Sequence, residues 1–226
     1  MPILLWLAAR NGRKSRLDGY ILRNSGCKPE LSKYIAPMKF IAIVGMPGSG
    51  KSVAAEFFRK KGIPVLRFGD ETDRGVTAAG KSLTEQNERE WREAIRRELG
   101  MAAMAIKIEP RIREAVSRSE IPLHGTESHD KIVLDGLYSW EEYVYLKKKF
   151  DQLILLCIWA TPAIRYDRLG NRAVRPLTHE DARNRDIAEI EQLNKGGPIA
   201  IADYLIENNS DHASFINRLE QFFSSL

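Results

Sequence analysis

The sequence predicts an α/β protein with a parallel five-stranded sheet that is covered by helices on both faces. Short apolar runs that are typical of strands alternate with segments of helical periodicity, and this alternation favours parallel strands joined by helical crossovers. The chain has 226 residues, of which 43% are apolar, and this is enough for one such domain with a sizeable core.

Each element follows from a local pattern along the chain. Strands are expected at residues 40–44, 65–68, 131–136, 152–160 and 202–206. The run at 152–160 is apolar almost throughout, as expected for a strand that is covered on both faces. A polar stretch, 71–82, follows the second strand. Helical segments are expected at 53–58, 84–117, 163–172 and 211–224. A further helix is expected after residue 178, where Thr178 and Asp181 can form its cap.

The loop after the first strand has the sequence GMPGSGKS at residues 45–52, which fits the pattern G-x-x-x-x-G-K-[ST] without a mismatch. A strand before it and a helix after it are what a phosphate-binding loop requires, because backbone N–H groups and the helix N-terminus then converge on one anion. We expect Lys51 to bridge the terminal phosphates and Ser52 to ligate Mg²⁺. The predicted phosphate-binding residues are Gly45, Met46, Pro47, Gly48, Ser49, Gly50, Lys51, Ser52 and Val53.

The nucleotide is expected to be ATP. The guanine-specific pattern N-K-x-D is absent, because Asn194-Lys195 is followed by Gly196-Gly197. Asp135 ends the strand 131–136, where an acid that orients Mg²⁺ beside the loop is expected, although a turn-initiating Asp-Gly is the alternative.

A series of arginines follows the fourth strand. Their spacings of 3, 4 and 3 would place all four on one face of a helix, around a transferring phosphoryl group. A merely solvated basic face is the alternative. The series consists of Arg165, Arg168, Arg172 and Arg175, and Arg183 and Arg185 beyond Pro176 could close over the nucleotide from the far side.

Asp70 stands at the tip of the second strand, where an acceptor would lie across from ATP. If the acceptor is an alcohol, Asp70 could take the proton of its hydroxyl. If the acceptor is a phosphate, Arg74 is better suited to bind it. The alternative is that GDET only caps a helix.

The charge of the chain is unevenly distributed. Residues 1–37 hold seven basic and two acidic residues, which accounts for the whole net charge of +5, whereas residues 38–226 hold 28 of each. Nucleic-acid binding is therefore not expected for 38–226. The segment 1–37 is predicted to be a disordered extension or the product of an upstream start before Met38, with targeting as the alternative.

The remaining composition favours the cytoplasm. No run approaches the 18 apolar residues that a membrane span needs. The two cysteines, Cys27 and Cys157, make no metal or disulfide pattern, and Cys157 is expected in the core.

Four segments together resemble the nucleoside-monophosphate-kinase-like P-loop proteins: GMPGSGKS, LDGLYSW, RYDRLGNR and IADYLIENN. Within that group they are most similar to the dephospho-CoA kinases and a largely archaeal family related to them, over residues 38–215. The resemblance implies a three-layer P-loop NTPase fold with a helical acceptor region and a short lid. It also implies roles in the lid for Arg168 and Arg172, and a place near the base for Asn208 and Asn209. The catalytic acid would be Asp70, with Glu71 and Asp73 as rivals.

The predicted function is that of a kinase that uses ATP and Mg²⁺ to phosphorylate a nucleotide-like small molecule of the nucleoside monophosphate or dephospho-CoA type. Lys51 and the arginines would neutralise charge in the transition state, and closure of residues 163–185 would exclude water. A nucleotide-gated regulatory ATPase with slow hydrolysis and no small acceptor is the first alternative. A nucleic-acid-associated ATPase is the second.

Overall fold

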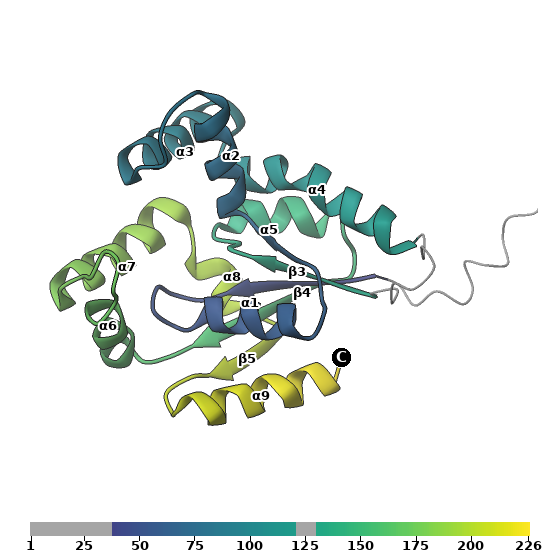
Figure 1. The fold of residues 1–226 in the computed structure, drawn as a ribbon, viewed down its shortest axis with the longest axis vertical. Helices are drawn as coiled ribbons and strands as arrows, with labels where there is room; N and C mark the ends of the chain where they lie inside the picture. Colours follow the sequence, from purple (N-terminus) through teal and green to yellow (C-terminus); the bar gives the residue numbers. More distant parts are fainter. Residues whose placement is uncertain (1–37, 121–129) are drawn as a thin grey trace, which may run out of the picture. The chain divides into compact units, whose positions relative to one another are not determined.

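The computed structural model describes residues 38–120 and 130–226 and confirms the predicted parallel α/β fold (Figure 1). The prediction for residues 1–37 lies outside this part of the chain. The sheet has the order β2-β3-β1-β4-β5, and every pairing is parallel. Its strands are β1 (Lys39–Val44), β2 (Val65–Arg67), β3 (Lys131–Asp135), β4 (Leu153–Trp159) and β5 (Tyr204–Glu207).

Helices connect the strands and extend beyond the sheet. Thr178 caps one of them by accepting a hydrogen bond from the Asp181 N–H, as predicted. The helices are α1 (Lys51–Lys60), α2 (Gly69–Ala78), α3 (Glu85–Leu99), α4 (Ala103–Glu120), α5 (Trp140–Lys147), α6 (Pro162–Gly170), α7 (His179–Leu193), α8 (Gly196–Ala200) and α9 (His212–Ser224). Within residues 38–120 and 130–226, no helix is long and apolar enough to cross a bilayer.

Alternation along the central strand produces two separate cores, because successive side chains of a strand point to opposite faces. Phe40, Ala42 and Val44 of β1 pack on one face against α4 and α5. Ile41 and Ile43 pack on the other face against α1 and α9. Cys157 lies in the first core and is buried and free, as predicted.

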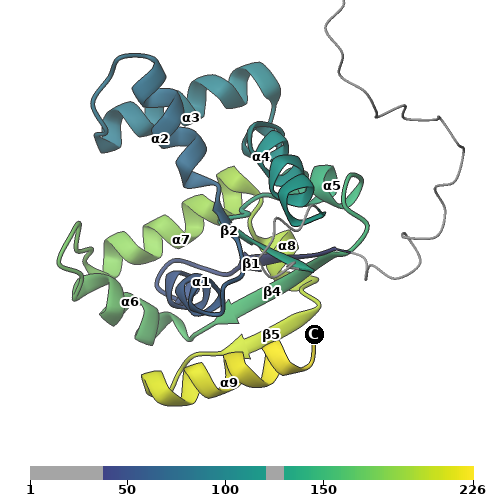
Figure 2. The ribbon, with the colours of Figure 1, turned by 45° about the vertical axis from the view of Figure 1, so that its right-hand side comes forward.

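Two helical pairs, α2–α3 and α6–α7, lie beyond the ends of the strands rather than against the sheet (Figures 1 and 2). In the first pair α3 packs very closely on α2, because a Cβ at Gly75 would come within 2.0 Å of the Trp91 ring. The second pair follows β4 and supplies the arginines of the sequence motif.

Several boundaries differ from the sequence prediction. The polar stretch 71–82 is mostly helical, because α2 begins at Gly69, directly after the short strand β2. The helical region 84–117 is divided in two at Gly100, whose φ of 77° does not continue a helix. The helix predicted at 163–172 ends at Gly170, and its chain turns so that the Leu177 N–H bonds to the Leu169 carbonyl.

Candidate nucleotide site

The predicted phosphate-binding loop lies at the carboxyl end of the central strand, between β1 and α1. Gly50 is the N-cap residue of α1 and has a φ of 105°, which strongly favours glycine. A Cβ at this position would also come within 2.3 Å of the Asn208 amide nitrogen. The backbone therefore adopts this loop only with glycine at residue 50, and it leaves the N-terminus of α1 facing the place where a phosphate would bind.

Lys51 is the first residue of α1 and folds back over the loop. Its Nζ donates hydrogen bonds to the carbonyl oxygens of Gly45 at 2.8 Å and Met46 at 2.9 Å. Burial, together with the positive charges of Lys195 and Arg185, lowers the pKa of Lys51 to about 7, while the negative charges of Glu189 and Asp135 oppose the change. A phosphate bound at the loop would supply the negative charge that stabilises the ammonium form here.

Asp135 and Ser52 fit the binding of Mg²⁺. Asp135 ends β3 beside Ile43 of β1, and its half-buried carboxylate makes no hydrogen bond or ion pair within the described residues. Burial raises its pKa, against the positive charge of Lys51. Ser52 has an exposed position in the first turn of α1. Two hard oxygen donors suit Mg²⁺, which takes few protein ligands and completes its shell with water and phosphate.

The described residues contain no group of three or more His, Cys, Asp or Glu side chains that could form a closed metal site.

From the segment after β5, Asn208 braces the loop and Asn209 braces the residue before α6. The Asn208 amide donates to the Ser49 carbonyl at 2.8 Å and is buried. The Asn209 side chain accepts from the Thr161 N–H at 2.9 Å, just before α6. Both amides are thus engaged by the backbone, and their contact with a base stays a prediction.

The prediction that four arginines share one face around an anion is wrong. Arg165 is buried in an ion pair with Asp186 of α7, with Nη2 to Oδ2 at 2.6 Å, and also donates to Pro47 O at 3.0 Å. Arg175 lies beyond the end of α6 and forms exposed ion pairs with Glu85 and Glu88 of α3. The spacing argument failed because α6 ends before the third arginine.

Arg168 and Arg172, the two arginines named for the lid, differ from each other in their surroundings. Arg168 Nη2 donates to the Asn208 carbonyl at 2.9 Å, and its Nη1 is buried without a hydrogen-bond partner in the described structure. Arg172 is exposed and follows the end of α6. Desolvation lowers the pKa of both arginines. Their contact with a phosphoryl group stays a prediction.

Two residues whose charges act on Lys51, Glu189 and Lys195, were not assigned a place in the site from the sequence, whereas Arg185 was expected to close over the nucleotide. Glu189 of α7 pairs with Lys195, and its second oxygen accepts from Arg185 Nε at 3.0 Å. Lys195 is buried, and its Nζ lies 4.4 Å from the centre of the Tyr138 ring. The sequence offers only one signal for this cluster, the i,i+4 spacing of Arg185 and Glu189, which is also common on solvated helices.

Asp70 lies in the first turn of α2 rather than at a strand tip. Its carboxylate accepts from Arg111 of α4 at 3.2 Å and pairs with Arg67 at 3.5 Å. Glu71 takes the other nitrogen of Arg111 at 2.7 Å. Arg74 is exposed and pairs only loosely with Glu71, at 4.0 Å. These contacts join α2 to α4, and the catalytic role of Asp70 stays a prediction.

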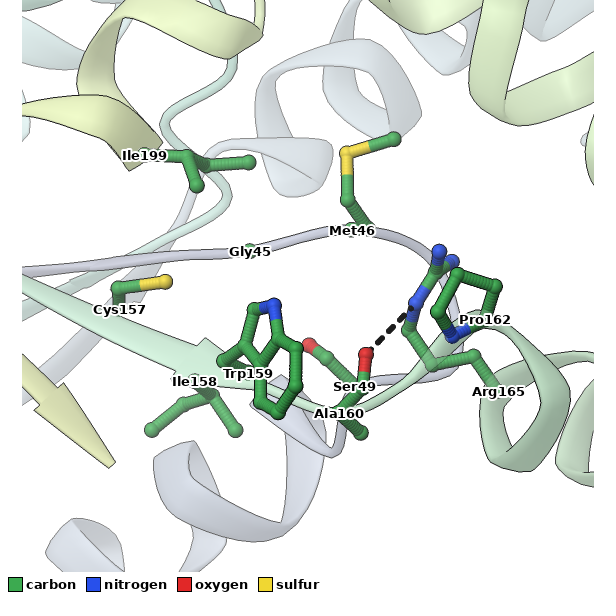
Figure 3. A pocket seen from close by; sticks show the side chains of 10 residues that line it. All are labelled: Gly45, Met46, Ser49, Cys157, Ile158, Trp159, Ala160, Pro162, Arg165 and Ile199. Atoms are coloured by element: carbon green, nitrogen blue, oxygen red, sulfur yellow. Dashed lines mark hydrogen bonds between the residues drawn. The ribbon is translucent and has the colours of Figure 1, made fainter. Parts of the chain in front are cut away.

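A small cavity adjoins the loop on the side of α8 (Figure 3). Met46, Trp159 and Ile199 form its walls, and the dashed line in Figure 3 is the hydrogen bond from Arg165 Nε to Ala160 O, at 3.2 Å. Its volume of about 80 Å³ is well below the roughly 300–1,000 Å³ of small-molecule pockets. This cavity alone is therefore too small to hold a nucleotide.

Comparison with known proteins agrees with this geometry. The family model described as AAA domain matches residues 41–194, a range that includes the loop, Asp135 and both α6 and α7. The UPF0200 protein of Pyrococcus horikoshii is 31% identical over 190 residues, which cover 82% of this chain and 96% of that protein. The chain belongs to the AAA-domain and UPF0200 families. The UPF0200 protein of Pyrococcus abyssi is 32% identical to this chain, and the match covers 80% of this chain and 92% of that protein.

Solved structures show where the fold of this UPF0200 chain recurs. Protein TT1252 from Thermus thermophilus has a TM-score of 0.55 and 22% identity, covering 84% of this chain and 99% of its own. Shikimate kinase from Acinetobacter baumannii, in complex with shikimate, has a TM-score of 0.50 and 16% identity, covering 86% and 97%. The UPF0200 chain thus has a P-loop kinase-like fold.

Proposed function

We propose that this chain is a kinase that transfers the γ-phosphoryl group of ATP to a nucleotide-like small molecule. The observation that carries the proposal is the convergence of charged side chains on Lys51. The charges of Asp135 at the end of β3, of Arg185 and Glu189 on α7, and of Lys195 just before α8 all act on Lys51 and shift its pKa. An assembly of this kind suits a reaction whose catalysis is mostly positioning and charge neutralisation.

The loop and Lys51 would bind the phosphate chain. Lys51 would leave the carbonyl oxygens of Gly45 and Met46 and donate to phosphate oxygens instead. Ser52 and Asp135 would hold Mg²⁺, which supplies charge neutralisation to the phosphates when it is bound. Arg168 has an unpaired buried nitrogen for the same purpose, and Arg172 would contribute from the segment after α6.

The remaining loop residues and the two asparagines complete this proposal. Asn208 would keep the loop in shape and Asn209 would fix the start of α6, with the base lying near both. The residues 45–53 would supply the backbone donors that surround the phosphates.

The transfer itself needs little from the protein. An acceptor oxygen forms a bond to the γ-phosphorus, the bond from that phosphorus to the β–γ bridging oxygen breaks, and ADP leaves. An alcohol acceptor also loses a proton, which we assign to Asp70. A phosphate acceptor would have no proton to lose, and Asp70 would then serve only to join α2 to α4 through Arg111. Asp70→Asn should therefore lower the rate strongly only with an alcohol acceptor.

The acceptor class rests on the resemblance to nucleoside-monophosphate-kinase-like and dephospho-CoA-kinase-like proteins, because the fold alone does not fix a substrate. The assignment of the reaction to the cytoplasm, where ATP and Mg²⁺ are available, is part of the same proposal.

The test measures ADP formation with dephospho-CoA, AMP, CMP, UMP or no acceptor, in the full chain and in Lys51→Ala. Shikimate serves as the negative control, because shikimate kinase shares the fold of this chain but acts on a substrate that is not nucleotide-like. Stimulation by one nucleotide-like acceptor, lost in Lys51→Ala, would support the kinase. A slow rate that no acceptor changes would favour the nucleotide-gated ATPase instead.

A further inference from the structure

Helix α7 carries two buried acids on one face, and each of them binds a cation from another segment. Asp186 binds Arg165 of α6, which in turn donates to the loop at Pro47 O. Glu189, three residues later, binds Lys195. Because residues three apart lie on the same side of a helix, both pairs fix the same face of α7 above the loop.

The second pair has a second cation as an additional member, whereas the first has the Tyr166 hydroxyl, which donates to Asp186 Oδ2 at 3.1 Å. One oxygen of Glu189 pairs with Lys195, whose side chain is only 2% exposed. The other oxygen accepts from Arg185 Nε at 3.0 Å, and the Arg185 side chain is 44% exposed. The carboxylate therefore joins a fully buried cation to one that can reach a ligand.

The position of this cluster beside Lys51 indicates a purpose other than stability. A buried ion pair is weak support for a fold, since apolar side chains of similar size often replace it at no cost. An i,i+4 pair on a helix such as Arg185 with Glu189 also contributes little by itself. Yet the charges of Lys195, Glu189 and Arg185 all act on Lys51, the residue that we propose binds the terminal phosphates.

We propose that Glu189 is a positioning residue for phosphoryl transfer, which holds Arg185 toward the transferring group and is itself fixed by Lys195. The inference rests on the proposed function. Lys195 anchors the carboxylate from one side, and the Tyr138 ring lies against its ammonium group. The guanidinium of Arg185, oriented through Nε, then presents its two remaining nitrogens to the phosphate oxygens.

Loss of Glu189 would free Arg185 to turn into solvent, and it would leave the loop and Lys51 in place. The ground-state contacts of ATP would therefore persist, while charge neutralisation in the transition state would weaken. A small misplacement of a catalytic group costs about 100-fold in rate, so the effect should fall on kcat rather than on ATP affinity.

The experiment compares Glu189→Gln, Arg185→Ala and their combination by the rate of ADP formation at saturating ATP and by the Kd for ATP. Each single change should lower kcat by about 100-fold and change the Kd by only a few-fold. The combined variant should be little slower than either single variant, because both changes remove the same interaction. Glu191→Gln, on the exposed side of the same helix, is the matched control and should retain the wild-type rate.

A second variant separates positioning from folding. Glu189→Leu combined with Lys195→Met removes both buried charges and should keep the thermal midpoint near that of the wild type. We expect this variant to be as slow as Glu189→Gln. A wild-type rate in this variant would overturn the inference and leave Glu189 with a structural role only. The same holds if the loss of kcat in the combined Glu189→Gln and Arg185→Ala variant equals the product of the two single losses.

The two proposals can fail separately. If the wild type binds and turns over ATP in a Lys51-dependent way, and Glu189→Gln has the same kcat, only the positioning role is wrong. If the wild type neither binds ATP nor depends on Lys51, both proposals fall together.

Discussion

The ion pair between Arg165 and Asp186 joins helices α6 and α7, and Arg165 also bonds to the loop at Pro47 O, so removal of the pair tests how strongly this buried contact stabilises the fold. Nη1 and Nη2 of Arg165 lie 3.0 and 2.6 Å from the two carboxylate oxygens. The side chains are only 5% and 9% exposed. Asp186→Ala would leave a buried guanidinium whose remaining acceptors are the carbonyls of Pro47 and Ala160.

The expected cost of Asp186→Ala is about 3–5 kcal/mol in the free energy of unfolding, because one partner of a buried pair then stays uncompensated. For a chain of this length each kcal/mol corresponds to roughly 2–4 °C in Tm, so the midpoint should fall by roughly 6–20 °C. The double variant Arg165→Met with Asp186→Leu should lose much less than the sum of its single variants, because it removes the unpaired charge as well.

Urea unfolding followed by circular dichroism measures these differences. Asp167→Ala is the matched control, since Asp167 pairs with His179 across the same two helices but both side chains are 64% exposed. An exposed pair contributes at most about 1 kcal/mol, so the control should change little. The ATP affinity of the double variant should also fall, because the Pro47 carbonyl loses the hydrogen bond that Arg165 Nη1 donates to it.

A cost of less than about 1 kcal/mol for Asp186→Ala, equal to that of the control, would contradict this reasoning. So would a double variant whose loss equals the sum of the single losses. Either result would mean that the pair is not desolvated as the structure has it.

Two other predictions concern the loop and the pH dependence of stability. Gly50→Ala should weaken ATP binding at least 10-fold, because its Cβ would meet the Asn208 amide at 2.3 Å and displace the loop. A 10-fold loss corresponds to about 1.4 kcal/mol in the free energy of binding, which calorimetry measures. Gly80→Ala also has positive φ but has open space around it, so it should leave ATP affinity unchanged, and equal effects would refute the packing argument. Burial raises the pKa of Glu142 from 4.5 to about 7, so between these values the folded state holds a proton that the unfolded state releases. Stability should therefore fall by about 3 kcal/mol as the pH rises through that window and then level off. Glu142→Gln should flatten this slope in unfolding measurements, and an unchanged slope would exclude Glu142 as its source.

The sheet and the loop were predictable from the sequence because their signals are local. The apolar run of β1 and the pattern from Gly45 to Ser52 each specify backbone conformation within a few residues. The fold class follows from the order of such segments, and it is confirmed. The boundaries of the fourth strand and the cap at Thr178 agree to within one residue.

The contacts of helices α6 and α7 were not predictable, because their side chains are placed by contacts between distant segments. Arg165 and Arg168 look alike in the sequence, yet one is neutralised by Asp186, which is 21 positions away, and the other keeps an unpaired nitrogen. Helical spacing extends only as far as the helix, and α6 ends at Gly170. The pair of Glu189 with Lys195 depends in the same way on the turn between α7 and α8, which spacing alone does not reveal.

Transfer of label from γ-labelled ATP tests the central claim most directly. The full chain is incubated with labelled ATP, Mg²⁺ and each candidate acceptor, and the label is divided between inorganic phosphate and a phosphorylated organic product. We predict that one nucleotide-like acceptor takes up most of the label and that Lys51→Ala abolishes this transfer. Label that appears only as inorganic phosphate, at a rate that no acceptor changes, would contradict the assignment as a kinase.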